Sequence, residues 1–104
     1  MTAFTNKVYG IVAQIPAGKV ATYGDVARLA GNPGASRAVG MAMSHNQDTA
    51  RVPCHRVVGS DGSMHGYAFG GVVTKREMLE REGVAMTGDR VDLSQSRWQP
   101  DTPA

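Results

Sequence analysis

The chain has 104 residues, of which 41% are hydrophobic, and a formal net charge of +2 at neutral pH. That length suits one small domain with a single modest core, and the hydrophobic content gives no indication of disorder. The single cysteine excludes an intramolecular disulfide framework, and no apolar run approaches the length that spans a membrane. We expect a cytoplasmic or nuclear protein with one domain, residues 1–100, and a short flexible tail, residues 101–104.

The charge is unevenly distributed along the chain. Residues 1–58 contain six basic and two acidic residues, a net charge of +4, whereas residues 59–104 have a net charge of −2. A basic first half suits contact with the phosphates of a nucleic acid. A solvated surface explains the same excess equally well, so the charge alone does not decide between the two.

The first half of the chain predicts three helices. Apolar residues recur at helical spacing over residues 4–14, which should form an amphipathic helix that ends before Pro16. Thr22 followed by Asp25 resembles a capping box and should open a second, short helix. After a break rich in Gly and Pro, a third helix is expected over residues 35–44. Two short helices joined in this way suit a helix-turn-helix, with an ordinary helical hairpin as the alternative.

The second half predicts a strand, a loop and a hairpin. Residues 57–58 are apolar and β-branched, and a strong turn signal follows them at residues 59–62. Residues 63–71 are rich in glycine and are interpreted as a loop. Residues 84–93 suit a short β-hairpin with its turn at residues 87–89.

One more helix is expected between that loop and the hairpin. Thr74 with Glu77 resembles a second capping box, which should open a helix that runs to about Glu82. Gly83 should close this helix, because glycine readily adopts the left-handed conformation found after many helix ends.

The only cysteine, Cys54, stands directly beside His55 and Arg56. A thiol reacts as its thiolate, which a neighbouring base or positive charge favours. Adjacent residues on a strand point to opposite faces, so Cys54 and His55 can cooperate only if Pro53 turns the chain. From the pair alone, a buried structural cysteine is the simpler interpretation, since free cysteines are commonly buried.

A wider pattern favours a reactive cysteine instead. Residues 53–58, Pro-Cys-His-Arg-Val-Val, resemble the active-site hexapeptide of the O6-alkylguanine-DNA alkyltransferases, in which the cysteine accepts the alkyl group. Further motifs of that family occur in order at residues 15–20, 22–24, 30–33, 36–40 and 82–83. So many ordered matches are very improbable by chance. The resemblance implies an α/β fold: a compact, mostly helical domain with a winged helix-turn-helix and a few short strands.

The resemblance also implies how DNA is bound. The altered base lies inside a duplex, so it must be flipped into a pocket. Arg37 matches the arginine finger that fills the gap left by the flipped nucleotide; the alternative is an ordinary surface arginine. Tyr23 matches the tyrosine that contacts this nucleotide and can supply a proton as guanine leaves; the alternative is a core aromatic. The DNA-binding residues implied in this way are Tyr23, Ala35, Ser36, Arg37, Gly40 and Tyr67.

Five catalytic residues follow from the same resemblance. His55 matches the base that acts on the cysteine through water, and Glu82 matches the carboxylate that orients the imidazole. Asn46 matches a hinge asparagine whose side chain ties the backbone beneath the active-site loop, and Tyr23 completes the set with Cys54. Arg56 is expected to form a structural ion pair or to contact phosphate.

A metal site is a weak alternative for the same cysteine and histidines. The spacing of Cys54, His45, His55 and His65 fits no common zinc pattern. No metal and no cofactor are therefore expected.

The sequence departs from the family in two places. Alkyltransferases carry a separate N-terminal domain, and this chain begins almost at the DNA-binding domain. In the loop of residues 64–71, Ala68 and Phe69 stand where the family has a hydroxyl that donates to O6, although Tyr67 matches a neighbouring tyrosine. Both the length and the Trp-Gln-Pro ending at residues 98–100 resemble the alkyltransferase-like proteins, which bind the lesion without repairing it.

Two hypotheses for the function remain, with a third of lower weight. The protein accepts an alkyl group from O6-alkylguanine in double-stranded DNA onto Cys54, in a single turnover. Alternatively it is a lesion sensor that binds the same DNA as a monomer and recruits nucleotide excision repair proteins. A winged-helix transcription regulator would explain the helix-turn-helix but not Cys54, His55 and Glu82. None of the three involves a membrane.

Overall fold

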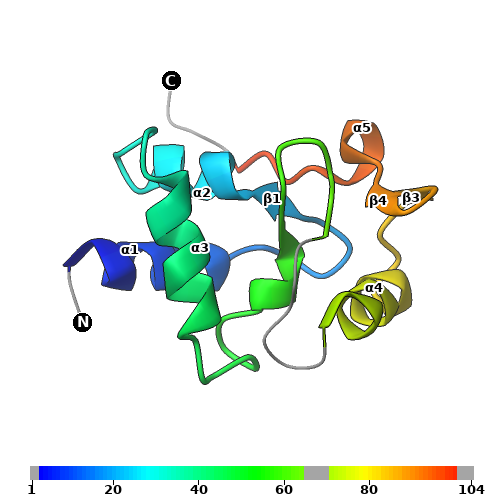
Figure 1. The fold of residues 1–104 in the computed structure, drawn as a ribbon, viewed down its shortest axis with the longest axis horizontal. Coiled ribbons are helices and arrows are strands. Elements are labelled where there is room, and N and C mark those ends of the chain that lie inside the picture. The colour runs from blue at the N-terminus through cyan, green and yellow to red at the C-terminus, as the bar shows by residue number, and fades with distance from the viewer. Residues whose placement is uncertain (1–2, 65–70, 101–104) are drawn as a thin grey trace.

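The computed structural model describes residues 3–64 and 71–100 (Figure 1). In chain order, the elements are α1 (Ala3–Val12), β1 (Ala21–Thr22), α2 (Tyr23–Leu29), α3 (Ser36–Ser44), the 3-10 helix η1 (Cys54–Arg56), β2 (Val57–Val58), α4 (Gly71–Arg81), β3 (Met86–Thr87), β4 (Arg90–Val91) and α5 (Leu93–Ser96). The mostly helical α/β fold with a few short strands is confirmed. No helix in the described ranges is long and apolar enough to cross a bilayer.

The first three helices share one hydrophobic core. Val8 and Val12 of α1, Val26 of α2 and Val39 of α3 are fully buried in it. The hydroxyl of Tyr9 donates a 2.8 Å hydrogen bond to the carbonyl oxygen of Ala42, which fastens α1 to α3. α3 therefore packs on α1 and α2 through one face and leaves the other face outward (Figure 1).

Short strands join the helical part to the segment that carries the cysteine. β1 pairs in parallel with β2, with Ala21 opposite Val57 and Thr22 opposite Val58. On its other side the chain around Val20 is flanked by the C-terminal segment: the Trp98 backbone NH donates to the Val20 carbonyl oxygen at 2.7 Å. The start of α2, the cysteine turn and the C-terminal segment are thus held together.

β3 and β4 form the small antiparallel hairpin predicted for residues 84–93, and Met86 lies opposite Val91. This wing packs closely on the turn at Gly62, where φ is +85°. A Cβ atom at Gly62 would lie 2.2 Å from the carbonyl oxygen of Val91, so only glycine fits there. The wing and the turn after β2 therefore approach through backbone atoms.

Most predicted helices are confirmed, with one error and one omission. Thr22 and Asp25 form a complete capping box at the start of α2. The second predicted capping box, Thr74 with Glu77, is wrong: α4 begins at Gly71, so Thr74 lies inside the helix. α5, which Asp92 caps, was not predicted.

The remaining structural expectations fall partly outside the described residues. The tail at 101–104 and most of the loop at 63–71 belong to the ranges that are not described. The single-domain organisation of residues 1–100 remains a prediction.

Candidate functional site

The cysteine lies on a turn rather than on a strand. Pro53 precedes η1, whose three residues begin at Cys54, and the backbone NH of Arg56 donates to the carbonyl oxygen of Pro53 at 2.9 Å. Because η1 replaces the extended conformation, Cys54 and His55 are not forced onto opposite faces. Cys54 is a free cysteine with 5% of its surface exposed.

Asn46 supports this turn from beneath. Its side-chain amide donates a 2.8 Å hydrogen bond to the carbonyl oxygen of Val52, two residues before Cys54. Its side-chain oxygen accepts from the backbone NH of Asp48 at 3.1 Å. Asn46 is 3% exposed, so it ties two backbone segments in a place where an unpaired polar group would be costly.

His55, Arg56 and Glu82 form one hydrogen-bonded cluster. Nε2 of His55 lies 3.1 Å from both carboxylate oxygens of Glu82. Arg56 donates to the same carboxylate from Nε at 3.0 Å and from Nη2 at 2.6 Å. Its Nη1 donates to the carbonyl oxygen of Ile15 at 2.7 Å. Arg56 thus forms an ion pair that fixes the carboxylate facing the imidazole.

The position of Glu82 follows from how α4 ends. Gly83 has φ +87° and its NH donates to the carbonyl oxygen of Glu80, while the NH of Val84 donates to that of Leu79. This pair of hydrogen bonds is the Schellman motif, in which a left-handed glycine closes a helix. Glu82, just before the glycine, is therefore held at the end of α4 and faces η1.

The surroundings of His55 keep its imidazole neutral. Burial lowers the pKa of His55, and although Glu82 opposes this, the net shift is downward. Burial alone would raise the pKa of Glu82, but hydrogen bonds from Arg56 and His55 lower it, so the carboxylate is charged. A neutral imidazole beside a carboxylate carries its proton on the nitrogen that faces it, here Nε2.

The other ring nitrogen is then a free acceptor. Nδ1 of His55 is buried and has no hydrogen-bond partner among the described residues. Buried polar atoms normally have partners, and an unpaired one at a site of chemistry suggests a group used in the reaction. An unprotonated Nδ1 on the residue next to Cys54 can take up the thiol proton, directly or through one water molecule.

Sequence reasoning missed one residue of this site, Lys75. It lies on α4, is 1% exposed, and its Nζ donates a 2.7 Å hydrogen bond to the carbonyl oxygen of Val57. Burial lowers the pKa of Lys75 to about 8, and the negative charge of Cys54 as thiolate acts in the opposite direction. The sequence did contain a signal for Lys75: it lies one turn before Leu79, at a position where the helical pattern of α4 calls for an apolar residue.

Tyr23 joins the surroundings of the cysteine to the outward face of α3. Burial, and secondarily the charge of Cys54, raise the pKa of Tyr23, so its phenol remains protonated at neutral pH. Lys75 Nζ lies 5.9 Å from the centre of the Tyr23 ring. Tyr23 also lines an open hollow of about 300 Å³ with Ser36, Arg37 and Gly40 of α3. The candidate active site and the outward face of α3 therefore meet at Tyr23.

Most side chains next to Arg37 on the outward face of α3 are small. Ser36, Arg37 and Ala38 are exposed, while Ala35 and Gly40 are partly exposed. A Cβ atom at Gly40 would meet no other described part of the chain within 4 Å, so packing against those residues does not require glycine there. Glycine inside a helix costs about 1 kcal/mol relative to alanine. Its presence suits a surface that another molecule approaches closely.

Some predicted residues do not enter the described site. Tyr67, His65, Ala68 and Phe69 lie outside the described residues. His45 is exposed at the end of α3. Within residues 3–64 and 71–100, no three His, Cys, Asp or Glu side chains gather as a metal ion would need.

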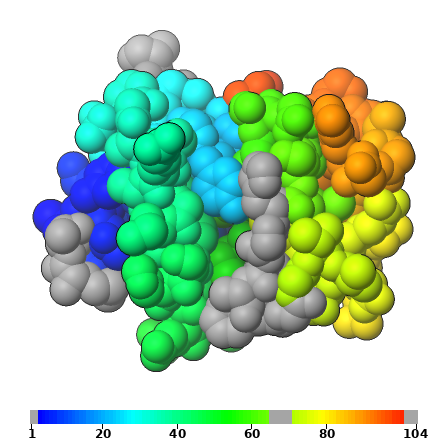
Figure 2. Space-filling view, viewed as in Figure 1, coloured from blue at the N-terminus to red at the C-terminus, as the bar shows by residue number. Residues whose placement is uncertain are grey.

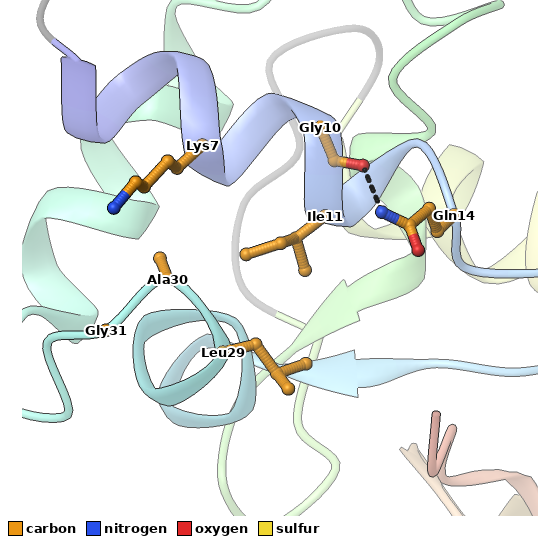
Figure 3. A pocket seen from close by; sticks show the side chains of 7 residues that line it. All are labelled: Lys7, Gly10, Ile11, Gln14, Leu29, Ala30 and Gly31. Carbon is orange, nitrogen blue, oxygen red and sulfur yellow. Dashed lines mark hydrogen bonds between the residues drawn. The ribbon is translucent and has the colours of Figure 1, made fainter. Parts of the chain in front are cut away.

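A second hollow, of about 310 Å³, lies away from the cysteine. Figure 3 shows α1 facing the end of α2 across it, with Ile11 opposite Leu29 and Ala30. The side chain of Gln14 donates to the carbonyl oxygen of Gly10 at 3.2 Å along its edge. None of the site residues described above lines it.

Comparisons with known proteins find relatives over most of this chain. A protein from Picrophilus torridus named bifunctional methyltransferase/endonuclease is 41% identical over 91 residues, covering 88% of this chain and 30% of its own length. The methylated-DNA–protein-cysteine methyltransferase of Mycobacterium tuberculosis H37Rv is 46% identical over 81 residues, covering 78% and 48%. The chain therefore spans about half the length of this second relative, and less of the first.

Two solved structures are similar over the fold. S. pombe Atl1 in complex with damaged DNA containing O6-carboxymethylguanine has a TM-score of 0.81 at 39% identity, covering 96% of this chain and 98% of that one. Mycobacterium tuberculosis OGT in complex with DNA has a TM-score of 0.74 at 45% identity, covering 79% and 49%. The model of the 6-O-methylguanine DNA methyltransferase DNA-binding domain matches residues 3–84. The chain belongs to the family of the 6-O-methylguanine DNA methyltransferase DNA-binding domain.

Proposed function

We propose that this protein binds O6-alkylguanine in duplex DNA, flips the altered nucleotide, and transfers the alkyl group irreversibly to Cys54. The observation that carries the proposal is the His55–Glu82–Arg56 cluster next to a buried free cysteine, with a His55 Nδ1 that has no partner among the described residues. A cysteine buried only for packing needs no neighbouring base whose second nitrogen is oriented by a charged carboxylate. The relatives named as cysteine methyltransferases support the same reaction class.

The proposed reaction uses the residues in an ordered way. Nδ1 of His55 takes the thiol proton. Nε2–H keeps its hydrogen bond to the Glu82 carboxylate, whose negative charge stabilises the imidazolium. The thiolate sulfur attacks the alkyl carbon, the S–C bond forms as the O6–C bond breaks, and the bonding pair leaves with guanine. The phenol of Tyr23, protonated at neutral pH, donates the proton that the guanine takes up, and the phenolate regains a proton from the His55 imidazolium through solvent. Cys54 stays alkylated, so each molecule reacts once.

DNA binding is assigned to α3 and to the start of α2. Arg37 is exposed on α3 beside Tyr23, and its planar guanidinium can stack in the gap that the flipped base leaves. The surface of α3 carries few bulky side chains at Ser36, Ala38 and Gly40, so the duplex can come close to the helix backbone. Double-stranded DNA is the partner, and a cytoplasmic or nuclear location would follow from it.

The second candidate is a lesion sensor that binds the same DNA without transfer and recruits excision repair proteins. The structural match with S. pombe Atl1, which covers 96% of this chain and 98% of that one, favours it. That comparison extends over 96% of this chain with a TM-score of 0.81, whereas the match with Mycobacterium tuberculosis OGT extends over 79% with a TM-score of 0.74.

Intact mass separates the two candidates. The wild-type protein is incubated with duplex DNA containing one O6-methylguanine, and a gain of one methyl group, located at Cys54 by peptide mapping, is expected. Cys54→Ser should gain nothing and should bind the lesion duplex within about 1 kcal/mol of wild type, since the swap changes little volume. Tight lesion binding by a wild type whose mass stays unchanged would reject transfer and leave the sensor.

A further inference from the structure

Met41 is an unusual residue on the outward face of α3. Its side chain is 61% exposed, and within the described residues only Val72 and Val73 of α4 are other large apolar side chains with comparable exposure. Single exposed apolar side chains are ordinary on protein surfaces. Met41 differs because of where it lies: in the middle of the helix that carries Arg37.

The helix geometry places Met41 next to Arg37. Residues four apart on an α-helix lie one above the other on the same face, so Arg37 and Met41 are neighbours. Val39, Ala42 and Met43 face the core. The exposed residues Arg37, Met41 and Ser44 therefore follow one another along the outward face of α3. Figure 2 shows this helix lying across the viewer's side of the molecule.

Two residues close to Met41, Ala38 and Gly40, have no bulk that could cover its thioether. A Cβ atom at Gly40 would meet nothing within 4 Å outside its own helix among the described residues. Because Met41 lies one turn from Arg37 on the same helix face, a duplex that binds at Arg37 comes close to Met41 as well. An unbranched, polarisable chain suits the irregular apolar surface of sugars and partly unstacked bases, and methionine is among the residues that proteins insert into minor grooves.

We propose that Met41 is a second DNA-contacting side chain, which packs against the sugar and base faces of the duplex beside Arg37 and holds the opened base step. This inference rests on the proposed binding of duplex DNA by α3. Arg37 supplies charge and a planar surface, whereas Met41 supplies apolar contact and neutralises no phosphate. The loss of DNA affinity on removing Arg37 should therefore depend on salt concentration, whereas the loss on removing Met41 should not.

Two substitutions of similar size test the contact. Met41→Gln keeps the length of the side chain but makes it polar, and Met41→Leu keeps it apolar. Both should melt at the wild-type temperature, because Met41 is exposed in the free protein. Dissociation constants are measured by fluorescence anisotropy for a duplex with one O6-methylguanine, for its lesion strand alone and for the undamaged duplex, each at several salt concentrations.

Met41→Gln should bind the lesion duplex about five-fold more weakly than wild type, a loss of about 1 kcal/mol. Its affinity for the single strand should change by less than about two-fold, and the slope of log K against log salt should stay the same. Met41→Leu should retain most of the wild-type affinity. Unchanged duplex affinity in Met41→Gln, or an equal loss on duplex and single strand, would overturn the proposal.

The undamaged duplex separates this inference from the proposed function. If wild type does not prefer the lesion but Met41→Gln still loses about five-fold on undamaged duplex, lesion recognition fails and the contact by Met41 stands. If wild type prefers the lesion and Met41→Gln binds as wild type does, the proposed function stands and this inference fails.

Discussion

Arg97 and Asp25 lie 72 residues apart and form a two-point ion pair, with Arg97 Nε donating to Oδ2 at 2.9 Å and Nη2 donating to Oδ1 at 2.5 Å. The same Oδ2 accepts from the backbone NH of Thr22, so the carboxylate that caps α2 also anchors the C-terminal segment. α2 begins at Tyr23. Arg97 lies beyond the matched family model, which ends at residue 84. It nevertheless anchors α2, the helix that carries Tyr23.

Two arginines meet this carboxylate, which gives a matched pair of variants. Arg97→Met should lower the free energy of unfolding by about 1–3 kcal/mol, because it leaves Asp25, 3% exposed, without its main partner. Arg28→Met should cost less than about 0.5 kcal/mol, because the Arg28 side chain is 59% exposed and contributes one 3.2 Å contact. Urea denaturation at neutral pH measures both. Equal losses would contradict the special role of Arg97.

The same ion pair makes a prediction about acid. Burial would raise the pKa of Asp25, but hydrogen bonds from Arg97, Thr22 and Arg28 lower it from 3.8 to about 2. A carboxyl whose pKa is lower in the folded state stabilises the fold above its unfolded pKa. The contribution should therefore be full above about pH 4 and lost as pH falls toward about 2. Asp25→Asn should remove this dependence, which unfolding curves between these two pH values would show.

The sequence predicted the scaffold better than the buried charges. Helix periodicity and turn residues are local signals, and they were sufficient for α1 to α3, for the wing and for Gly83 as the end of α4. The start of α4 was wrong because Thr74 with Glu77 satisfies a capping pattern that also occurs inside helices. No local pattern could show that residues 71–73 already take up the helical conformation.

The residues predicted to be catalytic were identified through a family resemblance rather than through local chemistry. The pair Cys54–His55 alone favoured a structural cysteine, and only the structure shows that Glu82 lies against His55 with Arg56 on its other side. The burial of Lys75 and the pairing of Arg97 with Asp25 depend on contacts 18 and 72 residues apart in the chain. Such contacts follow from tertiary packing, which a single sequence does not display.

Arg37→Ala should weaken binding to a lesion-containing duplex more than binding to the same lesion in a single strand. The reason is that an arginine in the gap offsets the loss of stacking, which a single strand hardly requires. Competition experiments with both substrates at one salt concentration measure the difference. Arg51→Ala is the control, because Arg51 is also an exposed arginine but lies outside α3, and its loss should affect both substrates alike. A uniform loss in Arg37→Ala would mean an ordinary phosphate contact.

Lys75 should give the protein an unusual response to alkaline pH. Its pKa is lowered by burial to about 8 from 10.5, so between these values the unfolded chain binds a proton that the folded protein has released. Stability therefore rises with pH over that window relative to a variant without the amine. The difference in unfolding free energy between wild type and Lys75→Met should change by about 2–4 kcal/mol from pH 8 to 10.5. Lys7→Met, at an exposed position, should show the same pH dependence of the unfolding free energy as wild type.

The pH dependence of alkyl transfer tests the role of His55. Transfer needs a neutral imidazole, and burial lowers the pKa of His55 below its ordinary 6.5. The single-turnover rate should therefore persist below pH 6.5 and fall only when the ring becomes protonated. Quenched samples analysed by intact mass give this rate at each pH.

Glu82→Gln should change that profile in two ways. The carboxylate raises the pKa of His55 through a hydrogen bond and its charge, so its loss should lower that pKa further and move the acid limb to lower pH. The rate on the plateau should fall without reaching zero, because a less basic imidazole takes the thiol proton less readily while Cys54 is still present. Glu80→Gln, an exposed position on α4 that pairs with Arg76, should leave the profile unchanged. NMR titration of the His55 ring measures the same pKa without transfer, and an upward shift in Glu82→Gln would contradict the assigned role of the carboxylate.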